Sequence, residues 1–347
     1  MIARRVTIRD VAAMAEVSNQ TVSRVLNDRP DVSDETRQRV WQVIEELNYH
    51  PSAIARSLIH QRSLTLGVIT AGLKFIGPSQ TLNGLTKQAE EAGYTLLLKE
   101  LPTFHTTDIQ PLINTLISRH VEGIIWAVPE IGDNWDWIQH QPPGLAVPMI
   151  FLTMQARPGV SVVTIDNYLG GRLATEHLLA QGYSRIGHLS GPLDWWEARQ
   201  RQDGWRDALH EAGLQVLDHH WVSGNWSAAS GAQQMEKLLE SYPEMDAVFV
   251  GNDQMALGAL QVMCKRSLRV PGDLAIVGFD GIPESAYYCP PLTTVSQDLG
   301  ELGSTAVKEL IQAIEAGHRD HVIFEPKQIS LRPELIVRES SLRPYKE

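Results

Sequence analysis

The 347-residue sequence contains only two cysteines, Cys264 and Cys289. A framework of disulfide bonds needs more, and so low a content is typical of a reducing cellular interior. No apolar run approaches the ~18 residues that span a membrane. The first ten residues, MIARRVTIRD, lack the apolar segment of a secretory signal. We therefore expect a cytoplasmic protein with no membrane partner.

Motifs that carry enzymatic chemistry are also missing. The sequence has no Walker phosphate loop, no G-x-G-x-x-G turn, no G-x-S-x-G nucleophile elbow and no Cys/His spacing typical of zinc. His318 and His321 lie in a polar connection, where two solvated histidines are favoured over metal ligands. The glycines of GNDQMALGAL are too far apart for a phosphate loop, and Asn252–Asp253 suits a strand end followed by a helix cap. The sequence thus predicts no catalytic residue, metal or cofactor.

Positive charge is scarce and unevenly distributed. Thirty Lys and Arg face forty-one Asp and Glu, a formal net charge of -11. Residues 1–63 hold nine arginines and eight acidic residues, so this segment carries +1 and the remainder −12. Because the N-terminal segment is only faintly basic, any affinity for DNA must depend on where its arginines lie.

Three short helices are predicted in the first fifty residues. Thr7 and Asp10 form a capping pattern before the first helix, Ser18 can cap the second, and Ser33 can cap the third. A tight connection at Glu16–Val17 would make the first two a helix-turn-helix. The capping pattern alone fits a small helical bundle without a DNA-binding role equally well.

The second of these helices, in VSNQTVSRVLN, sets hydroxyl, amide and guanidinium groups above apolar side chains. Such a surface suits DNA, since Asn and Gln pair with adenine edges, Arg with guanine, and hydroxyl groups with phosphates. The next segment, YHPSAIARSLIHQRS, begins a possible helix at Pro51, with Ile54 and Leu58 on one face. It is too short to be stable alone, because isolated helices below ~12 residues are marginal in water. It is either a linker or a helix that forms only when something holds it.

From Leu64 onwards, short apolar runs alternate with helical stretches, several of which end in glycine. Buried strands that alternate with helices predict an α/β fold with doubly wound parallel sheets. About 280 residues of this pattern exceed one sheet, so we expect two similar lobes separated by a cleft. Such clefts, at the carboxyl ends of parallel strands, bind small molecules.

The N-terminal segment VTIRDVAAMAEVSNQTVSRVLNDRPDVSDETRQRVWQVIEELNYHPSAIARSL closely resembles the DNA-binding head of the LacI/GalR (lactose-repressor) family of transcriptional regulators. Three later segments are similar to the family's namesake member, more than to the family average: SGPLDWWEARQRQDGW, GNWSAASGAQQM and CPPLTTVSQDLGELG. The resemblance covers residues 5–340. It implies a helix-turn-helix head (1–49), a hinge helix (50–62), a periplasmic-binding-protein-like core (63–340) and a tail (341–347). The first lobe would comprise residues 63–165 and 297–327, and the second 166–296 and 328–340.

The resemblance implies that the second helix enters the major groove of operator DNA and that a hinge helix wedges Leu58 into the minor groove. The implied DNA-binding residues are Thr7, Ser18, Asn19, Gln20, Thr21, Ser23, Arg24, Asn27, Ala55 and Leu58. Two positions depart from the family pattern. Glu16 occupies the turn that usually carries glycine, so a positive φ there would cost roughly 1–3 kcal/mol. Asn19 stands where the namesake has tyrosine, which predicts a different operator.

The resemblance also implies a sugar site in the cleft, where charged and amide groups bind hydroxyls and an indole covers the C–H face. The implied effector-binding residues are Ala71, Phe75, Gly77, Thr153, Trp195, Arg199, Trp226, Asn252, Asp280 and Gln297. Arg199 and Asp280 could instead simply pair with each other. Thr153 replaces an aspartate and Trp195 a serine of the namesake, so the identity of the sugar is open.

The family's tetramer-forming heptad tail is missing from this sequence, so the resemblance implies a homodimer. The expected function is allosteric repression of carbohydrate-utilisation genes, with release from the operator by a sugar effector. A ligand that acts as corepressor, or an activator of the same family, remains an alternative. A sugar transport receptor would need a secretory signal and no head. A sugar-processing enzyme would need a general acid and base at the cleft, which the sequence does not indicate.

Overall fold

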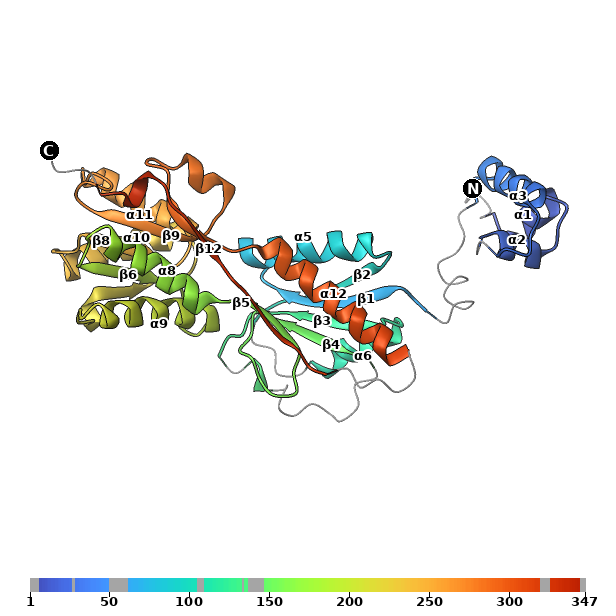
Figure 1. Cartoon of the computed structure of the whole chain (residues 1–347), viewed down its shortest axis with the longest axis horizontal. Helices are drawn as coiled ribbons and strands as arrows, with labels where there is room; N and C mark the ends of the chain where they lie inside the picture. Colours follow the sequence, from blue (N-terminus) through green and yellow to red (C-terminus); the bar gives the residue numbers. More distant parts are fainter. Residues whose placement is uncertain are drawn as a thin grey trace. The chain divides into compact units, whose positions relative to one another are not determined.

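The computed structural model describes residues 6–26, 29–49, 62–104, 109–132, 134–136, 147–318 and 325–343. The chain divides into two compact units, Met1–Leu64 and Thr65–Glu347, which we describe separately as the head and the core. Element labels follow Figure 1. None of the described helices combines the length and apolar character needed to cross a membrane.

The head contains the three predicted helices, α1 (Ile8–Met14), α2 (Asn19–Leu26) and α3 (Asp34–Glu46). Their apolar faces pack together around a small core that includes Val11, Val22, Val25, Val40 and Ile44, all buried. The polar side of α2 is not part of this hydrophobic core. The three helices of the expected helix-turn-helix arrangement therefore share one hydrophobic core.

The predicted caps of the head helices are present. The backbone N–H of Thr7 donates to Asp10 Oδ2 over 2.8 Å. Ser18 Oγ accepts from the backbone N–H of Thr21 at 3.1 Å, and Ser33 Oγ accepts from Thr36 at 3.4 Å. Each bond satisfies an N–H group that the start of a helix leaves without an intrahelical partner.

The connection between α1 and α2 has the backbone conformation that the sequence makes costly. Glu16 has φ of 54°, in the left-handed region that favours glycine. The backbone N–H of the next residue, Val17, bonds to the carbonyl of Ala12 at 3.0 Å, which closes the turn. A non-glycine residue thus carries backbone strain at this turn.

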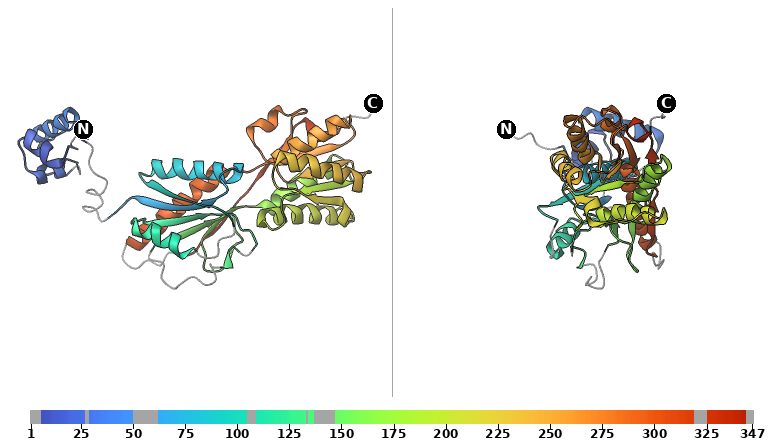
Figure 2. Two further views of the ribbon diagram at one scale, coloured as in Figure 1. Left: turned by 180° about the vertical axis from the view of Figure 1, so that it is seen from behind. Right: turned by 90° about the vertical axis from the view of Figure 1, so that its left-hand side faces the viewer.

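The first lobe of the core is built on a six-stranded parallel sheet of order β11-β5-β4-β3-β1-β2. Helices pack on both faces, giving one core under α5 and α12 and another under α6. Figures 1 and 2 show α12, which comes after most of the second lobe in sequence, beside α5. The strands are β1 (Thr65–Ala71), β2 (Thr95–Leu101), β3 (Gly123–Ala127), β4 (Met149–Leu152), β5 (Val162–Ile165) and β11 (Gln328–Leu331); the helices are α5 (Ile76–Glu91), α6 (Gln110–Ser118) and α12 (Leu299–His318).

The second lobe repeats this plan with the order β12-β10-β9-β8-β6-β7, in which only β12 runs antiparallel to its neighbour. One core lies under α10 and α11, and another under α8 and α9. The strands are β6 (Ile186–Ser190), β7 (Trp221–Ser223), β8 (Ala247–Val250), β9 (Ala275–Asp280), β10 (Thr293–Ser296) and β12 (Glu334–Ile336); the helices are α8 (Asn167–Ala180), α9 (Trp196–Glu211), α10 (Ala228–Ser241) and α11 (Asp253–Lys265). The predicted α/β fold with two sheet-based lobes is confirmed.

The chain passes between the lobes three times, after β5, after β10 and after β11. The last crossing corrects a predicted boundary. The sequence interpretation assigned residues 328–340 to the second lobe, but β11 pairs in parallel with β5 of the first, with Ile329 opposite Val163. Ile329 and Leu331 pack against the hydrophobic cluster under α5 and α12, so the strand completes the first sheet before the chain returns as β12.

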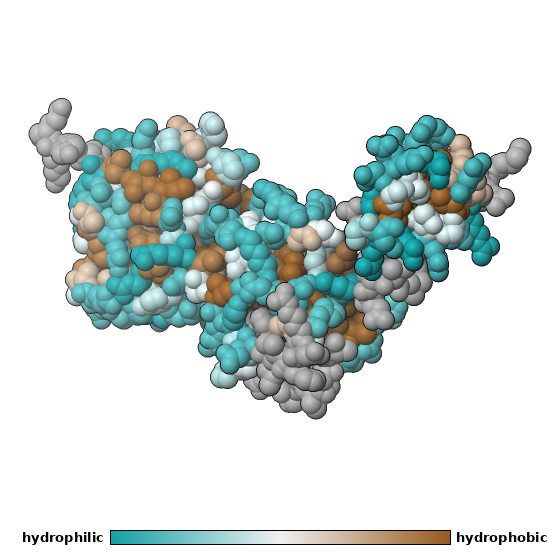
Figure 3. All heavy atoms as spheres, turned by 45° about the vertical axis from the view of Figure 1, so that its right-hand side comes forward, coloured by the Kyte–Doolittle hydropathy of each residue, from teal (hydrophilic) through white to brown (hydrophobic). Residues whose placement is uncertain are grey.

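Several large hydrophobic side chains on the surface of the two-lobed unit are exposed, among them Leu98 (40%), Leu257 (45%) and Tyr287 (87%). Hydrophobic surface is also visible among hydrophilic surface on the face shown in Figure 3. Scattered exposed leucines are ordinary in soluble proteins, so only their grouping in an interface would give them a role.

Candidate functional site

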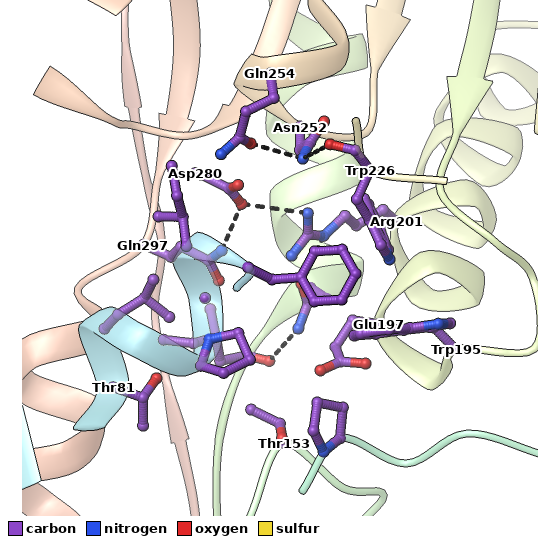
Figure 4. Close-up of a pocket in the computed structure, with 18 of the residues that line it drawn as sticks. Thr81, Thr153, Trp195, Glu197, Arg201, Trp226, Asn252, Gln254, Asp280 and Gln297 are labelled. Carbon is purple, nitrogen blue, oxygen red and sulfur yellow. Dashed lines mark hydrogen bonds and ion pairs between the residues drawn. The ribbon is translucent and has the colours of Figure 1, made fainter. Parts of the chain in front are cut away.

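A cavity of about 650 Å³ lies between the two lobes of the core. The first lobe contributes Phe75, Gly77, Thr81 and Thr153, among others, and the residues from the second lobe include Asp280. Figure 4 shows polar side chains converging on the cavity from several elements, with aromatic rings beside them. This volume and mixture suit a small organic ligand that carries several polar groups.

Arg201, on α9, is the central cation of the cavity. Its Nε donates to Asn167 Oδ1 at 2.8 Å and its Nη1 to the carbonyl of Gly251 at 2.6 Å. Nη1 also lies 3.5 Å from Asp280 Oδ1, and the guanidinium covers the Phe279 ring at 3.7 Å from its centroid. These bonds fix the side chain, which is only 6% exposed. A ligand would therefore meet a guanidinium already in position.

Asp280 ends β9 and turns its carboxylate towards the same point. Gln297, at the second crossing between the lobes, donates from Nε2 to Asp280 Oδ1 at 2.7 Å. Burial raises the pKa of Asp280 to about 6, while Arg201 and the Gln297 bond oppose this rise. Near neutral pH this carboxyl is largely ionised, so it can accept a hydrogen bond from a ligand hydroxyl.

A second carboxyl, Asp253, lies behind the cavity wall at the start of α11. It accepts from Thr294 Oγ1 at 2.7 Å and from the backbone N–H of Ile282 at 2.9 Å, and it is fully buried. Burial and the nearby charge of Asp280 raise its pKa to about 8. Asp253 therefore holds the loop after β9 in place rather than facing a ligand.

The structure corrects the expected position of the arginine. Arg199 does not line the cavity: its Nη1 donates to the carbonyl oxygens of Leu193 and Asp194, at 2.9 and 3.0 Å. The suggested pairing of Arg199 with Asp280 is wrong, and Arg201 makes that contact instead. Ala71 is also absent from the lining, because it is buried at the end of β1.

The other expected effector residues lie in the cavity wall. Asn252 caps α11, as the sequence indicates, because its Oδ1 accepts from the Met255 N–H at 2.9 Å. Its Nδ2 donates to the carbonyl of Trp226 at 3.0 Å and to Gln254 Oε1 at 2.8 Å. Asn252 thus also positions the Trp226 backbone. The eight expected residues that line the cavity are Phe75, Gly77, Thr153, Trp195, Trp226, Asn252, Asp280 and Gln297.

Aromatic rings from both lobes meet at one side of the cavity. The Trp195 ring packs edge-on against Phe104 (centroids 5.0 Å apart), Phe75 (5.9 Å) and Trp226 (5.7 Å). The Trp226 indole Nε1 is buried and has no hydrogen-bond partner within the described part of the chain. An unpaired buried donor beside a cavity indicates that a ligand atom or water accepts from it.

Three of the lining residues have strained backbones. Thr153, Trp226 and Asp280 have φ of 53°, 71° and 109°, respectively. Left-handed conformations are costly for residues with a Cβ atom, and they concentrate at binding sites. Their coincidence in one cavity supports a binding role for it.

Sequence reasoning missed several residues of the cavity wall, among them the charged residues Arg201 and Glu197. Both are on α9, both are more than 90% buried, and both lie in the quoted segment SGPLDWWEARQRQDGW. Charged residues are almost never fully buried unless they are paired. Charges at positions of α9 that face the interior of the lobe were therefore a sequence signal for a binding site.

In the head, the expected DNA-contact residues form the outer face of α2. Ser18, Asn19, Gln20 and Arg24 are exposed, whereas Thr21 and Ser23 are partly buried. Arg24 lies 3.4 Å from Asp31, and both side chains are more than half exposed. Thr7 is exposed at the start of α1. The expected contacts Asn27, Ala55 and Leu58, and most of the predicted hinge, lie outside the described residues.

Comparison with known proteins assigns both parts of the chain. Residues 7–52 match the family described as bacterial regulatory proteins, lacI family, and residues 175–341 match a periplasmic binding protein-like domain. The lactose operon repressor of Escherichia coli (strain K12) is 36% identical over 307 residues, which cover 88% of this chain and 84% of that protein.

Solved structures agree. A lac repressor dimer bound to operator and the anti-inducer ONPF matches with a TM-score of 0.85 and 33% identity, covering 98% of this chain and all of that one. A complex of the transcriptional regulator CelR with cellobiose matches with a TM-score of 0.69 and 31% identity, covering 97% and 100%. The head helices, the two-lobed core and these similarities together show that the chain belongs to the lacI family of bacterial regulatory proteins.

Proposed function

We propose that the protein is a cytoplasmic, homodimeric repressor of carbohydrate-utilisation genes, and that an uncharged sugar bound in the cavity releases it from its operator. The observation that carries the sugar assignment is the geometry around Asp280: one ionised carboxylate, one fixed guanidinium and one amide converge beside aromatic rings. Paired acceptors and donors suit vicinal hydroxyls, and ring faces suit the C–H surface of a pyranose.

Binding can be coupled to DNA affinity because the cavity is shared by two lobes. Phe75 and Thr153 come from the first lobe and Arg201 from the second, so a ligand that contacts both favours one angle of closure. A ligand shifts operator affinity only by its differential affinity for the two closures, commonly about 1–3 kcal/mol.

The homodimer is supported by the similarity to a lac repressor dimer bound to operator. In that relative the ligand is an anti-inducer, whereas the second similar structure contains cellobiose. Sugar binding could therefore change operator affinity in either of two directions. The sugar releases the protein from the operator, which we favour, or it acts as a corepressor.

Calorimetry with lactose, cellobiose and maltose tests the proposal, combined with operator binding in the presence and absence of each sugar. We expect one of these sugars to bind and to weaken operator binding. Asp280→Asn should remove most of the sugar affinity and keep the operator affinity, because the head does not contain this residue. Undiminished sugar binding by this variant would contradict the assignment of the cavity, and tighter operator binding with sugar would reverse the sign.

A further inference from the structure

The described residues that line the cavity include two carboxyl groups, Asp280 and Glu197, and the proposed sugar contacts use only Asp280. Glu197 lies in the first turn of α9, lines the cavity and is 8% exposed. Its Oε2 atom is buried and finds no hydrogen-bond partner among the described residues. Figure 4 shows its carboxyl group directed into the cavity, on the side of Thr153. A buried polar atom with no partner indicates a missing ligand contact.

Within the described part of the chain, the guanidinium groups whose charges act on Glu197 bond to other groups. Arg201 bonds to Asn167, Gly251 and Asp280, and Arg199 bonds to two backbone carbonyls. Arg157 forms two bonds with the carboxylate of Glu130, at 2.8 and 2.9 Å.

Glu130 is itself almost buried and packs beside the start of α9, where its carbonyl accepts from the backbone N–H of Trp196 at 3.0 Å. Its negative charge therefore faces Glu197 from the first lobe. The positive charge of Arg201 lowers the pKa of Glu197 more than the charge of Glu130 raises it, and Arg199 lowers it less.

Burial is the main cause that raises the pKa of Glu197 to about 7, and the charge of Glu130 adds to it. A sugar that fills the cavity would displace the water that remains near this carboxyl. Loss of water disfavours the ionised form further unless a cation replaces it. An uncharged sugar brings no cation.

We propose that Glu197 is a specificity-determining residue that contacts the effector as an uncharged carboxylic acid. Its O–H donates to a ring, glycosidic or hydroxyl oxygen of an uncharged sugar, and its C=O accepts from a neighbouring hydroxyl. The same group disfavours sugars that carry phosphate or carboxylate. Arg201 already bonds to Asp280 and Arg157 to Glu130, so neither guanidinium is free to balance an added anion. The ammonium group of Lys74, which also lines the cavity, lies over the Phe75 ring. This inference rests on the proposed function of the cavity.

The pH dependence follows from linkage. If the complex needs the protonated acid and the free carboxyl has a pKa of about 7, sugar affinity should fall about fivefold between pH 7 and pH 8. Asp280, with a pKa of about 6, is already ionised over this range and adds little. Asp253, with a pKa of about 8, titrates in the same range, so a variant must separate the two.

The test uses the full chain and whichever of lactose, cellobiose and maltose binds the wild type, with glucose 6-phosphate as the anionic probe. Calorimetry from pH 6.5 to 8.5, in two buffers of different ionisation enthalpy, measures affinity and proton uptake together. Glu197→Gln retains a donor and an acceptor without a charge. It should keep the affinity seen at pH 6.5, lose the fall between pH 7 and pH 8, and take up no proton.

Glu197→Ala should lose at least tenfold in affinity at every pH, and Gln at the same position should rescue it. Arg199→Gln, on the same helix, should keep the fall in affinity with pH but shift it to slightly higher pH, because Arg199 lowers the pKa of Glu197. An unchanged pH profile in Glu197→Gln would overturn the inference while leaving the sugar site standing, as would tight binding of glucose 6-phosphate to the wild type. If none of the three uncharged sugars bound the wild type, the proposed function itself would fail.

Discussion

Arg199 and Arg201 stand two residues apart on α9, and only Arg201 reaches the cavity. Two residues along a helix turn the side chain by about 200°, so neighbouring arginines at this spacing face opposite directions. Arg201 contacts Asp280 and Asn167, whereas Arg199 turns back to the carbonyls that precede the helix.

The first prediction separates these two arginines. Arg201→Gln should abolish measurable sugar binding. It should also lower the free energy of unfolding of the core by on the order of 3 kcal/mol, because it leaves Asp280 buried with a weaker partner. Arg199→Gln, the matched control, should change sugar affinity less than threefold. Calorimetry and thermal unfolding measure both effects, and an equal loss of sugar binding in the two variants would contradict the assignment of Arg201.

The two arginines also show what could not be predicted from the sequence, namely which side chains of a predicted helix face the cavity. The alternation of apolar runs and helices was enough for the two lobes, and capping residues such as Ser18 and Ser33 were enough for the head. Neither pattern encodes which of two similar side chains points into a cavity, since that depends on the rotation of α9 about its axis. Residues 328–331 were misassigned for a related reason. The sequence of an edge strand does not indicate which sheet it joins, because that depends on the strand it pairs with, here β5.

The second prediction concerns DNA reading by α2. Arg24→Ala should weaken operator binding by about 1–3 kcal/mol and relax the preference at one base pair. Its pair with Asp31 is exposed, so the substitution should leave the stability of the head nearly unchanged. Arg39→Ala, which removes an exposed charge from α3, serves as the control. Competition binding with operator and random DNA measures the difference; equal losses on both DNAs would reduce Arg24 to a phosphate contact.

The third prediction concerns the strained turn of the head. Glu16→Gly should raise the free energy of unfolding of the head by about 0.5–1 kcal/mol. Glycine removes the cost of the left-handed conformation at φ of 54° but brings a larger loss of chain entropy. Gln38→Gly, at an exposed position within α3, should instead destabilise by about 1 kcal/mol. Urea unfolding followed by circular dichroism on a fragment of residues 1–61 provides the measurement. Destabilisation by both substitutions would mean that Glu16 makes a stabilising contact that outweighs its backbone strain.

The fourth prediction concerns which sugar is preferred. Thr153 lines the cavity with a neutral hydroxyl, and its φ of 53° is unusually costly for a β-branched residue. The resemblance implies that the family's namesake has an aspartate here, and a carboxylate accepts a hydrogen bond from a hydroxyl more strongly than a threonine does. The wild type should therefore bind lactose, a β-galactoside, more weakly than a glucoside such as cellobiose.

Thr153→Asp should narrow or reverse this difference by about 1–2 kcal/mol, the gain of one hydrogen bond to a charged acceptor. Aspartate also tolerates the left-handed backbone better than threonine, so the substitution should not weaken the fold at this position. Thr153→Asn has the same shape and backbone tolerance without the charge, and it should leave the order of the two sugars unchanged. Calorimetry on the three proteins with lactose and cellobiose decides the matter. Tight lactose binding by the wild type, or an equal response of the Asp and Asn variants, would show that selectivity is set elsewhere in the cavity, with Trp195 and its aromatic neighbours as the next residues to test.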